Sequence, residues 1–207
     1  MGREIELKIP LTDSEYSHLK DVIFGKKTVK DLSFNRDVKY LYKKDEYFSR
    51  FETYQQRIQN NEPQCIRLRT EACLDEDGKI LDSKVYFTIK RKRRENGIEV
   101  NREDETEVAD AEVLRVFFES TGFIKWFSKE KRAYSVYITC EFLQNIPVHA
   151  ELETVNEYKY LEIEITDEKA DPDVIKEALE KTVKCLELNP QKKDPRSWIS
   201  IINNEAI

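Results

Sequence analysis

The sequence predicts an α+β protein in which an antiparallel β-sheet curls into a barrel and helices flank it. About eight segments alternate apolar and polar residues with the period of two that is typical of strands. Most neighbouring segments lie too close together in the chain for helical crossovers, so the sheet is expected to be antiparallel. In several segments the alternating polar positions carry charge, which predicts a barrel with a charged interior.

The individual elements are predicted from this alternation and from helix-capping patterns. The predicted strands are Arg3–Pro10, Asp37–Tyr42, Cys65–Ala72, Lys84–Arg93, Ile98–Val108, Lys131–Phe142, Val148–Val155 and Lys159–Thr166. The predicted helices are Thr12–Phe24, Asp45–Asn60, Asp110–Gly122 and two that begin at Asp171 and Asp194. Asp171 and Asp194 are each followed by proline, which is favoured at the first position of a helix.

The composition indicates a single soluble domain that spans residues 1–207. There are 35 Lys and Arg against 41 Asp and Glu, for a net charge of −6, whereas a general nucleic-acid-binding surface would be basic. No run of about 18 apolar residues predicts a membrane span, and the first residues lack the apolar core of a signal peptide. The four cysteines are scattered without a Cys-x-x-Cys pair, so a cytoplasmic protein with free thiols is expected.

Four of the predicted strands carry charge along one whole face. The polar faces consist of Glu4, Glu6 and Lys8; of Arg67 and Arg69; of Thr88, Lys90 and Lys92; and of Glu162 and Glu164. One such strand alone is typical of an ordinary sheet with a solvated face. Acids on two strands and bases on two others instead indicate that these faces turn toward one another and enclose a tunnel, because buried charges persist only when they are paired or bind a charged ligand.

The chemistry of these residues suggests what such a tunnel binds. Several carboxylates on adjacent strands form an all-oxygen site suited to Mg²⁺ or Mn²⁺. Arg and Lys opposite them would neutralise a polyanion, and Arg binds phosphate oxygens in pairs. A metal-bound triphosphate satisfies both halves. The two histidines, His18 and His149, lie in unrelated contexts, so a histidine metal site or a Ser-His-Asp triad is poorly supported.

Short motifs occur in a fixed order along nearly the whole chain. They are Glu4-Ile5-Glu6-Leu7-Lys8, Asp37-Val38-Lys39-Tyr40, Cys65-Ile66-Arg67-Leu68-Arg69, Phe87-Thr88-Ile89-Lys90, the acidic stretch Asn101–Asp110, Lys131-Arg132, Leu161-Glu162-Ile163-Glu164 and Asp194-Pro195-Arg196-Ser197-Trp198. Any one of them would occur by chance in many proteins. In this order they resemble the strands and the terminal helix of the CYTH superfamily, the triphosphate tunnel metalloenzymes.

The resemblance implies an eight-stranded closed antiparallel barrel with flanking helices and a bound Mg²⁺ or Mn²⁺. It implies metal-side acids at Glu4, Glu6, Glu103, Glu105, Glu162 and Glu164. It implies that the triphosphate is held, and turnover supported, by Lys8, Arg67, Arg69, Lys90 and Arg132, with Lys92 and Arg196 as further substrate-binding residues. Glu4 and Glu6 are expected to be catalytic together with the first five of these bases.

The chain also departs from the pattern of the resemblance. The predicted hairpin Val148–Tyr158 contains no glycine and carries two extra acids, Glu151 and Glu153. These two acids could face either the tunnel or solvent, and the solvent-facing position is favoured. The segment Asp45–Asn60 is longer than usual and could form a lid or bind the non-phosphate part of a substrate.

Three functions remain open on the sequence. The first is a metal-dependent triphosphatase that acts on tripolyphosphate, thiamine triphosphate, a nucleoside triphosphate or an RNA 5′ end, with nucleic acid otherwise an unlikely partner. The second is a class IV adenylyl cyclase, in which the 3′-hydroxyl of ATP attacks the α-phosphorus. The third is a polyphosphate-binding or nucleotide-binding module without turnover, which the intact acid set argues against. No membrane partner is expected, and the protein is expected to be a monomer or a homodimer.

Overall fold

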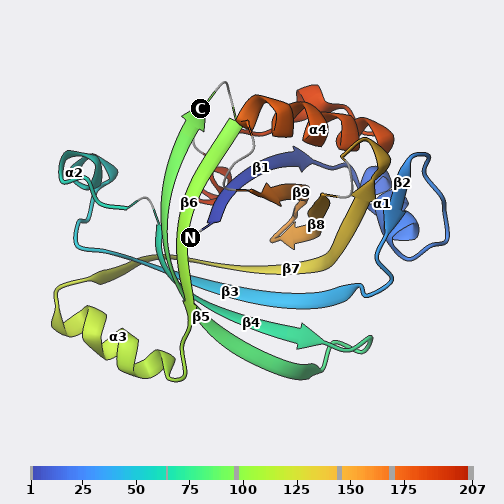
Figure 1. Cartoon of the computed structure of the whole chain (residues 1–207). Helices are drawn as coiled ribbons and strands as arrows, with labels where there is room; N and C mark the ends of the chain where they lie inside the picture. The colour runs from blue at the N-terminus through green and yellow to red at the C-terminus, as the bar shows by residue number, and fades with distance from the viewer. Residues whose placement is uncertain (1, 64, 96–97, 144–145, 168–170, 205–207) are drawn as a thin grey trace.

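The computed structural model describes residues 2–63, 65–95, 98–143, 146–167 and 171–204, and its strands form one antiparallel sheet (Figure 1). The strands are β1 (Gly2–Pro10), β2 (Leu32–Phe34), β3 (Lys39–Ser49), β4 (Cys65–Leu74), β5 (Ile80–Glu95), β6 (Ile98–Glu107), β7 (Ile124–Cys140), β8 (Pro147–Val155) and β9 (Tyr158–Thr166). The helices are α1 (Asp13–Ile23), α2 (Tyr54–Gln59), α3 (Ala111–Ser120), α4 (Pro172–Cys185) and α5 (Trp198–Ile202), with 3-10 turns η1 (Glu141–Leu143) and η2 (Pro190–Lys192).

Eight of the described strands close into a barrel. Each strand in the order β7-β3-β4-β5-β6-β1-β9-β8 pairs with the next, and β8 pairs with β7 to complete the circle. β2 adds a short extra strand to the end of β7. The predicted fold, a closed eight-stranded antiparallel barrel with flanking helices, is therefore confirmed, whereas β2 was not predicted.

The segment Asp45–Asn60 differs from the predicted helix. Its first part continues β3, which pairs with β4 and β7, and only Tyr54–Gln59 is helical, beginning at a capping box of Thr53 and Gln56. Asp45 and Tyr47 are buried inside the barrel, while Phe48 packs on its outer side. The prediction was wrong for β3 because the polar composition of this segment reflects a charged interior and not a solvated helix.

The last helix begins later than Asp194. The Asp194 carboxylate accepts hydrogen bonds from the backbone and the guanidinium of Arg196, at 3.0 Å and 2.8 Å respectively, and does not cap a helix. Ser197 is the N-cap residue, and its hydroxyl accepts from the backbone N–H of Ser200 at 3.2 Å. A serine two residues past the proline thus competes successfully with the Asp-Pro pair as the start of the helix.

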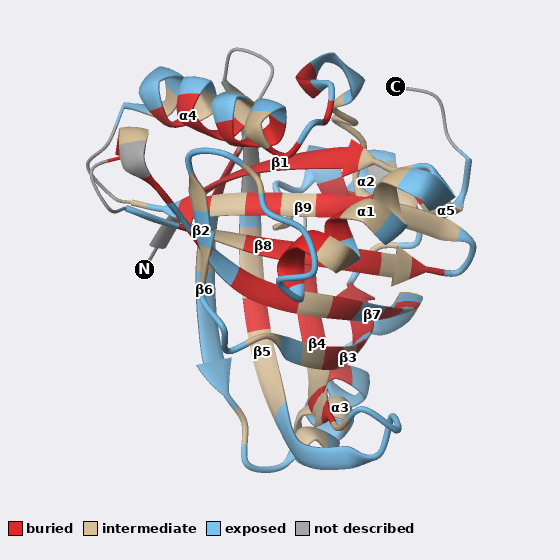
Figure 2. Cartoon of the chain, turned by 90° about the vertical axis from the view of Figure 1, so that its right-hand side faces the viewer, coloured by how far each residue is buried: buried red, intermediate tan, exposed pale blue. Residues whose placement is uncertain are grey.

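Helices cover parts of the outer surface of the barrel. Figure 2 shows α4 lying along β1 and β9 with its buried side turned toward them. The main apolar core lies in this layer and includes Ile5 of β1, Ile163 of β9, Leu19 of α1 and Leu179 of α4. A second cluster around Phe118 of α3 covers another part of the wall. None of the helices that the structure describes has the length and apolar character needed to span a bilayer.

The position of this core decides what faces the barrel interior. Residues alternate across a strand, so strands that turn their apolar residues outward toward helices must turn their other residues inward. On β1 the outward residues Ile5, Leu7 and Ile9 alternate with Glu6 and Lys8, which are also buried. Ordinary amphipathic strands thus produce a charged interior because the helices lie outside.

We predict that Leu179→Ala lowers the free energy of unfolding by about 2–5 kcal/mol, because it removes a fully buried side chain from the layer between α4 and the barrel. Val174→Ala on the same helix is the matched control, since Val174 is 62% exposed. Urea denaturation of both variants measures the difference. Equal losses in the two variants would contradict the assignment of the core to this layer.

Candidate functional site

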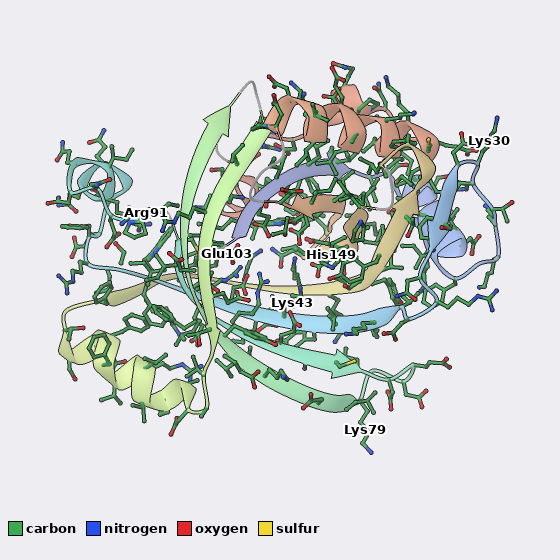
Figure 3. The ribbon with its side chains drawn as sticks, in the orientation of Figure 1. Lys30, Lys43, Lys79, Arg91, Glu103 and His149 are labelled. Carbon is green, nitrogen blue, oxygen red and sulfur yellow. The ribbon has the colours of Figure 1, made fainter. Side chains whose placement is uncertain are left out.

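The barrel encloses a cavity of about 1420 Å³ that is lined by charged side chains. Each of the eight barrel strands contributes at least one ionisable residue to this lining, and residues of α2 and of the segment around α5 line it as well. Figure 3 shows Lys43, Glu103 and His149 within the barrel, whereas Lys30 and Lys79 lie on outer loops. A volume of this size suits a ligand of several hundred daltons.

Three carboxylates meet on one side of the cavity. Glu4 and Glu6 project from β1 and Glu164 from β9, where Glu6 and Glu164 are direct partners in the sheet. One carboxylate oxygen from each lies within 4.8 Å of the others. Burial raises the pKa of Glu164 to about 7, and nearby Glu4 adds to the rise. Burial also raises the pKa of Glu4, against the effect of Lys90. This group of acids, Glu4, Glu6 and Glu164, is called the acid cluster below.

Cations and an amide surround the acid cluster. The Lys90 ammonium donates to Glu4 at 2.6 Å and to Glu6 at 3.3 Å, and it lies 3.4 Å from Glu103. Asn101 donates to Glu6 at 3.2 Å. Although burial disfavours its charge, Glu6 and Glu4 hold the pKa of Lys90 well above its ordinary value. Lys8 lies 3.6 Å from the other oxygen of Glu6, so the three carboxylates of the cluster have two lysines beside them.

The acid cluster fits a divalent cation. Its donors are all carboxylate oxygens, the ligands that Mg²⁺ and Mn²⁺ prefer. Opposite ligands of an octahedral Mg²⁺ site are about 4.2 Å apart, which is close to the 4.8 Å within which these three oxygens lie. The raised pKa values of Glu4 and Glu164 express the repulsion and desolvation that a cation would relieve. Glu4, Glu6 and Glu164 are therefore the residues that could hold the metal.

A second charged group is centred on Asp45, which is fully buried. Arg69 donates to its two oxygens at 2.7 Å and 3.0 Å, and Arg67 and Lys129 lie 3.7 Å and 3.4 Å away. Despite burial, Arg69 and Arg67 hold the pKa of Asp45 well below its ordinary value. Burial lowers the pKa of Lys129 to about 7, against the pull of Asp45. Arg69 is thus committed to Asp45 through two hydrogen bonds.

Arg67 is shared among several partners instead. Its guanidinium donates to Thr88 at 3.1 Å, to Glu103 at 3.3 Å and to Glu105 at 3.4 Å. These distances are longer than the two bonds between Arg69 and Asp45. All three partners accept from the same nitrogen, Nη2, whereas Asp45 lies 3.7 Å from Nη1. Arg67 is therefore the more exchangeable of the two arginines.

A third charged group joins β3, β4, β7, β8 and β9. Lys131 donates to Glu151 at 2.8 Å and to Glu153 at 2.7 Å, and Lys43 binds Glu151 and lies 3.2 Å from Glu71. Despite burial, Lys131 lowers the pKa of Glu162 to about 2. Burial and the charge of Glu162 hold the pKa of Glu153 well above its ordinary value.

The prediction that Glu151 and Glu153 face solvent was therefore wrong. Both are buried, at 5% and 0% exposure, and both bind Lys131. The hairpin of β8 and β9 belongs to the barrel wall, so alternate residues of β8 face inward together with those of β9. The sequence pattern alone could not decide between the two faces of this strand.

Most of the predicted site residues line the cavity. They are Glu4, Glu6, Lys8, Arg67, Arg69, Lys90, Glu103, Glu105, Glu162, Glu164 and Arg196. The acids do not form one group. Glu103 and Glu105 contact Arg67, and Glu162 lies near Lys131 and accepts from Trp198 at 3.5 Å. The side chain of Lys92 lies outside the described residues.

Arg132 is a correction to the predicted lining. It is exposed and lies on the outer face of β7, while its neighbours Lys131 and Ala133 are buried. Lys129, Lys131 and Ser135 are the residues of β7 that point into the barrel. Of the pair Lys131 and Arg132, Lys131 is therefore the one that reaches the cavity. The prediction was wrong because adjacent residues on a strand point to opposite faces, and the motif alone did not specify which face is inner.

Several lining residues were not predicted. Lys43, Lys129, Lys131 and His149 line the cavity, and Asp45 lies buried beside it. The alternation of Lys43, Asp45 and Tyr47 was available as a signal, but the segment from Asp45 onward was predicted as a helix. His149 had no signal in the sequence, because its partners lie on other strands.

We predict that Glu164→Gln stabilises the metal-free protein at pH 8 by on the order of 1 kcal/mol and gives a smaller gain at pH 5. The folded-state pKa of Glu164, about 7, lies above the ordinary value of a glutamate, so its contribution to stability is present at low pH and is lost as the pH rises through about 7. Glutamine removes this loss and still accepts from His149. Urea denaturation in EDTA at both pH values measures the change in the free energy of unfolding. Glu157→Gln, on an exposed turn, is the control. An equal or larger gain at pH 5 would contradict the prediction.

Solved structures share this fold, although no protein-family model and no curated protein matches the chain. The PH1819 protein of Pyrococcus horikoshii OT3 is similar with a TM-score of 0.71 and 18% identity, over 97% of this chain and 98% of that one. The PH1012 protein of the same organism has a TM-score of 0.65 and 23% identity, over 95% and 98%. HpAC1 of Hippeastrum, a candidate adenylyl cyclase with a dominant triphosphatase activity, has a TM-score of 0.58 and 14% identity, over 100% and 98%. The chain therefore has the triphosphate tunnel fold, as its resemblance to the CYTH superfamily predicted.

Proposed function

We propose that this protein is a divalent-metal-dependent triphosphatase that hydrolyses the terminal phosphate of a small-molecule triphosphate inside the barrel. The observation that supports the proposal is that two sets of opposite charge line one cavity. The acid cluster is the negative set, and Arg67, Lys90 and Lys8 form the positive set next to it. Binding of a polyanion alone would need only the basic set. A metal-bound triphosphate needs both.

Glu4, Glu6 and Glu164 are proposed to hold Mg²⁺ or Mn²⁺. Such an ion neutralises phosphate oxygens and lowers the pKa of a bound water when it is present. Glu103, Glu105 and Glu162 are proposed to act from the edge of this site, where the first two orient Arg67 through hydrogen bonds.

The cations of the cavity are proposed to bind the phosphate chain by exchanging partners. Lys90 is held by Glu4 and Glu6, and a cation on these acids would release its ammonium toward a phosphate oxygen. Arg67 can turn from Glu103 and Glu105 in the same way, and its fork can bind two phosphate oxygens together. Metal and triphosphate would therefore bind cooperatively, because each supplies the charge that the other displaces.

Hydrolysis is proposed ahead of cyclisation. HpAC1, which has the same fold, has a dominant triphosphatase activity although it is a candidate adenylyl cyclase. Arg196, the arginine of the terminal motif, is bound by Asp194 at 2.8 Å, so it is partly neutralised before any substrate arrives.

The test is incubation of the purified protein with tripolyphosphate, thiamine triphosphate and ATP, each with Mg²⁺ or Mn²⁺, followed by chromatography of the products. Orthophosphate together with the diphosphate product supports the proposal, and EDTA should abolish its formation. Cyclic AMP with pyrophosphate would identify a cyclase instead. No product from any of these substrates would favour a binding module.

We predict that Glu4→Ala and Glu6→Ala each abolish turnover with little loss of folding, because each removes a proposed metal ligand from the acid cluster. Steady-state kinetics measures turnover, and circular dichroism with thermal unfolding checks the fold. Glu130→Ala is the matched control, because this acid projects from β7 with a side chain that is 57% exposed. Unchanged activity in both cluster variants would refute the site.

We predict that Arg67→Ala chiefly raises KM, because it removes a proposed phosphate clamp. The matched control is Arg132→Ala, which deletes an exposed guanidinium on the outer face of the barrel and should leave KM unchanged. Initial rates over a range of triphosphate concentrations separate KM from kcat. A larger effect of Arg132→Ala than of Arg67→Ala would reverse the two assignments.

A further inference from the structure

His149 connects the acid cluster to the neighbouring strands. It lies on β8 directly opposite Glu164 on β9 and opposite Tyr137 on β7, so strand pairing fixes its position relative to both. Its Nδ1 lies 2.8 Å from an oxygen of Glu164, and its Nε2 lies 2.8 Å from the hydroxyl of Ser135 on β7. The ring packs against the ring of Tyr137, with centroids 5.1 Å apart.

These contacts determine the orientation of the imidazole. When Glu164 is ionised, as a metal ligand must be, its carboxylate has no proton to give, so Nδ1–H donates to it. Nε2 accepts a hydrogen bond from Ser135 in the neutral ring and donates one to Ser135 in the protonated ring, which the hydrogen bond to Glu164 favours by raising the pKa of His149. Both ring nitrogens are thus engaged by side chains of the barrel, and neither offers a lone pair or a proton directly to a substrate in the cavity.

The same contacts fix the carboxylate of Glu164. A glutamate side chain has several rotamers, and ordering it costs conformational entropy. The hydrogen bond from His149 engages one oxygen of Glu164, while the carboxyl group also lies against Glu4. The protein therefore orders this carboxylate before a ligand arrives. In metal sites the hydrogen-bond partners of ligating residues have the same effect.

We infer that His149 is a positioning residue that holds the carboxylate of Glu164 in the geometry that binds the divalent cation, with Ser135 holding His149 in turn. This inference rests on the metal site of the proposed function, and it adds a determinant of metal affinity that makes no contact with the triphosphate. It also makes metal binding by β1 and β9 depend on β7 and β8.

The test measures Mn²⁺ binding to the protein without substrate, by isothermal titration calorimetry. The amide of asparagine reaches about as far as Nδ1 of histidine, whereas the amide of glutamine reaches about as far as Nε2. We predict that H149A and H149Q weaken Mn²⁺ binding by about 10- to 100-fold, the usual range for an outer partner of a metal ligand. H149N should retain the hydrogen bond to Glu164 and bind Mn²⁺ much closer to the wild-type affinity.

The controls separate positioning from general damage. His18→Ala removes the other histidine, which lies in α1, and should leave Mn²⁺ affinity unchanged. Thermal unfolding in EDTA identifies any variant that does not fold, and the comparison between H149N and H149Q still decides the matter if H149A unfolds. Rescue by asparagine but not by glutamine supports the inference, because a purely structural role has no reason to follow the Nδ1 position.

Two results would overturn the inference: wild-type affinity in folded H149A, or equal affinities of H149N and H149Q. If those results occur while the wild-type protein binds Mn²⁺ and hydrolyses tripolyphosphate, the inference fails and the proposed function stands. If the wild-type protein binds Mn²⁺ and H149A and H149Q bind it more weakly, but no triphosphate is hydrolysed, the inference stands and the proposed function fails. Absence of Mn²⁺ binding to the wild-type protein would overturn both.

Discussion

Every charge that is buried inside the barrel needs an opposite charge within reach, and much of the structure follows from this requirement. The barrel brings acids and bases from eight strands into one enclosed space, where an unpaired charge would cost several kcal/mol. Asp45 is fully buried and is matched by Arg69, Arg67 and Lys129. Lys131 is matched by Glu151 and Glu153. The acid cluster differs in that three carboxylates lie within 4.8 Å of one another beside Lys90 and Lys8, and this crowding of acids makes it the natural place for a cation.

The same requirement explains why the apolar core lies outside the barrel wall. A charged interior cannot also hold the main apolar core, so the wall must bury its other face against helices. α4 and α1 supply that cover for β1, β8 and β9, and α3 supplies it for β3 and β4. The stability of the fold and the chemistry of the cavity therefore depend on opposite faces of the same strands, which allows the lining to change with little effect on the core.

The sequence predicted the strands and most of the lining because a period of two is preserved whatever the pairing between strands. Glu4 and Glu164 could be assigned to one tunnel on that basis. Arg132 could not be distinguished from Lys131, because the inward face of β7 depends on its register with β3 and β8. The bonds of His149 were invisible for the same reason, since pairing between strands brings its partners to it. Single-strand patterns predict what lies on a face, and only the assembled sheet determines what that face meets.

A row of opposed residues runs along β3 and β4. Tyr47 is opposite Arg67, Asp45 is opposite Arg69, and Lys43 is opposite Glu71. Each of these cations is already held by an acid: Arg67 by Glu103 and Glu105, Arg69 by Asp45, and Lys43 by Glu71 and Glu151. A polyanion that follows this row would therefore have to displace a carboxylate at every step.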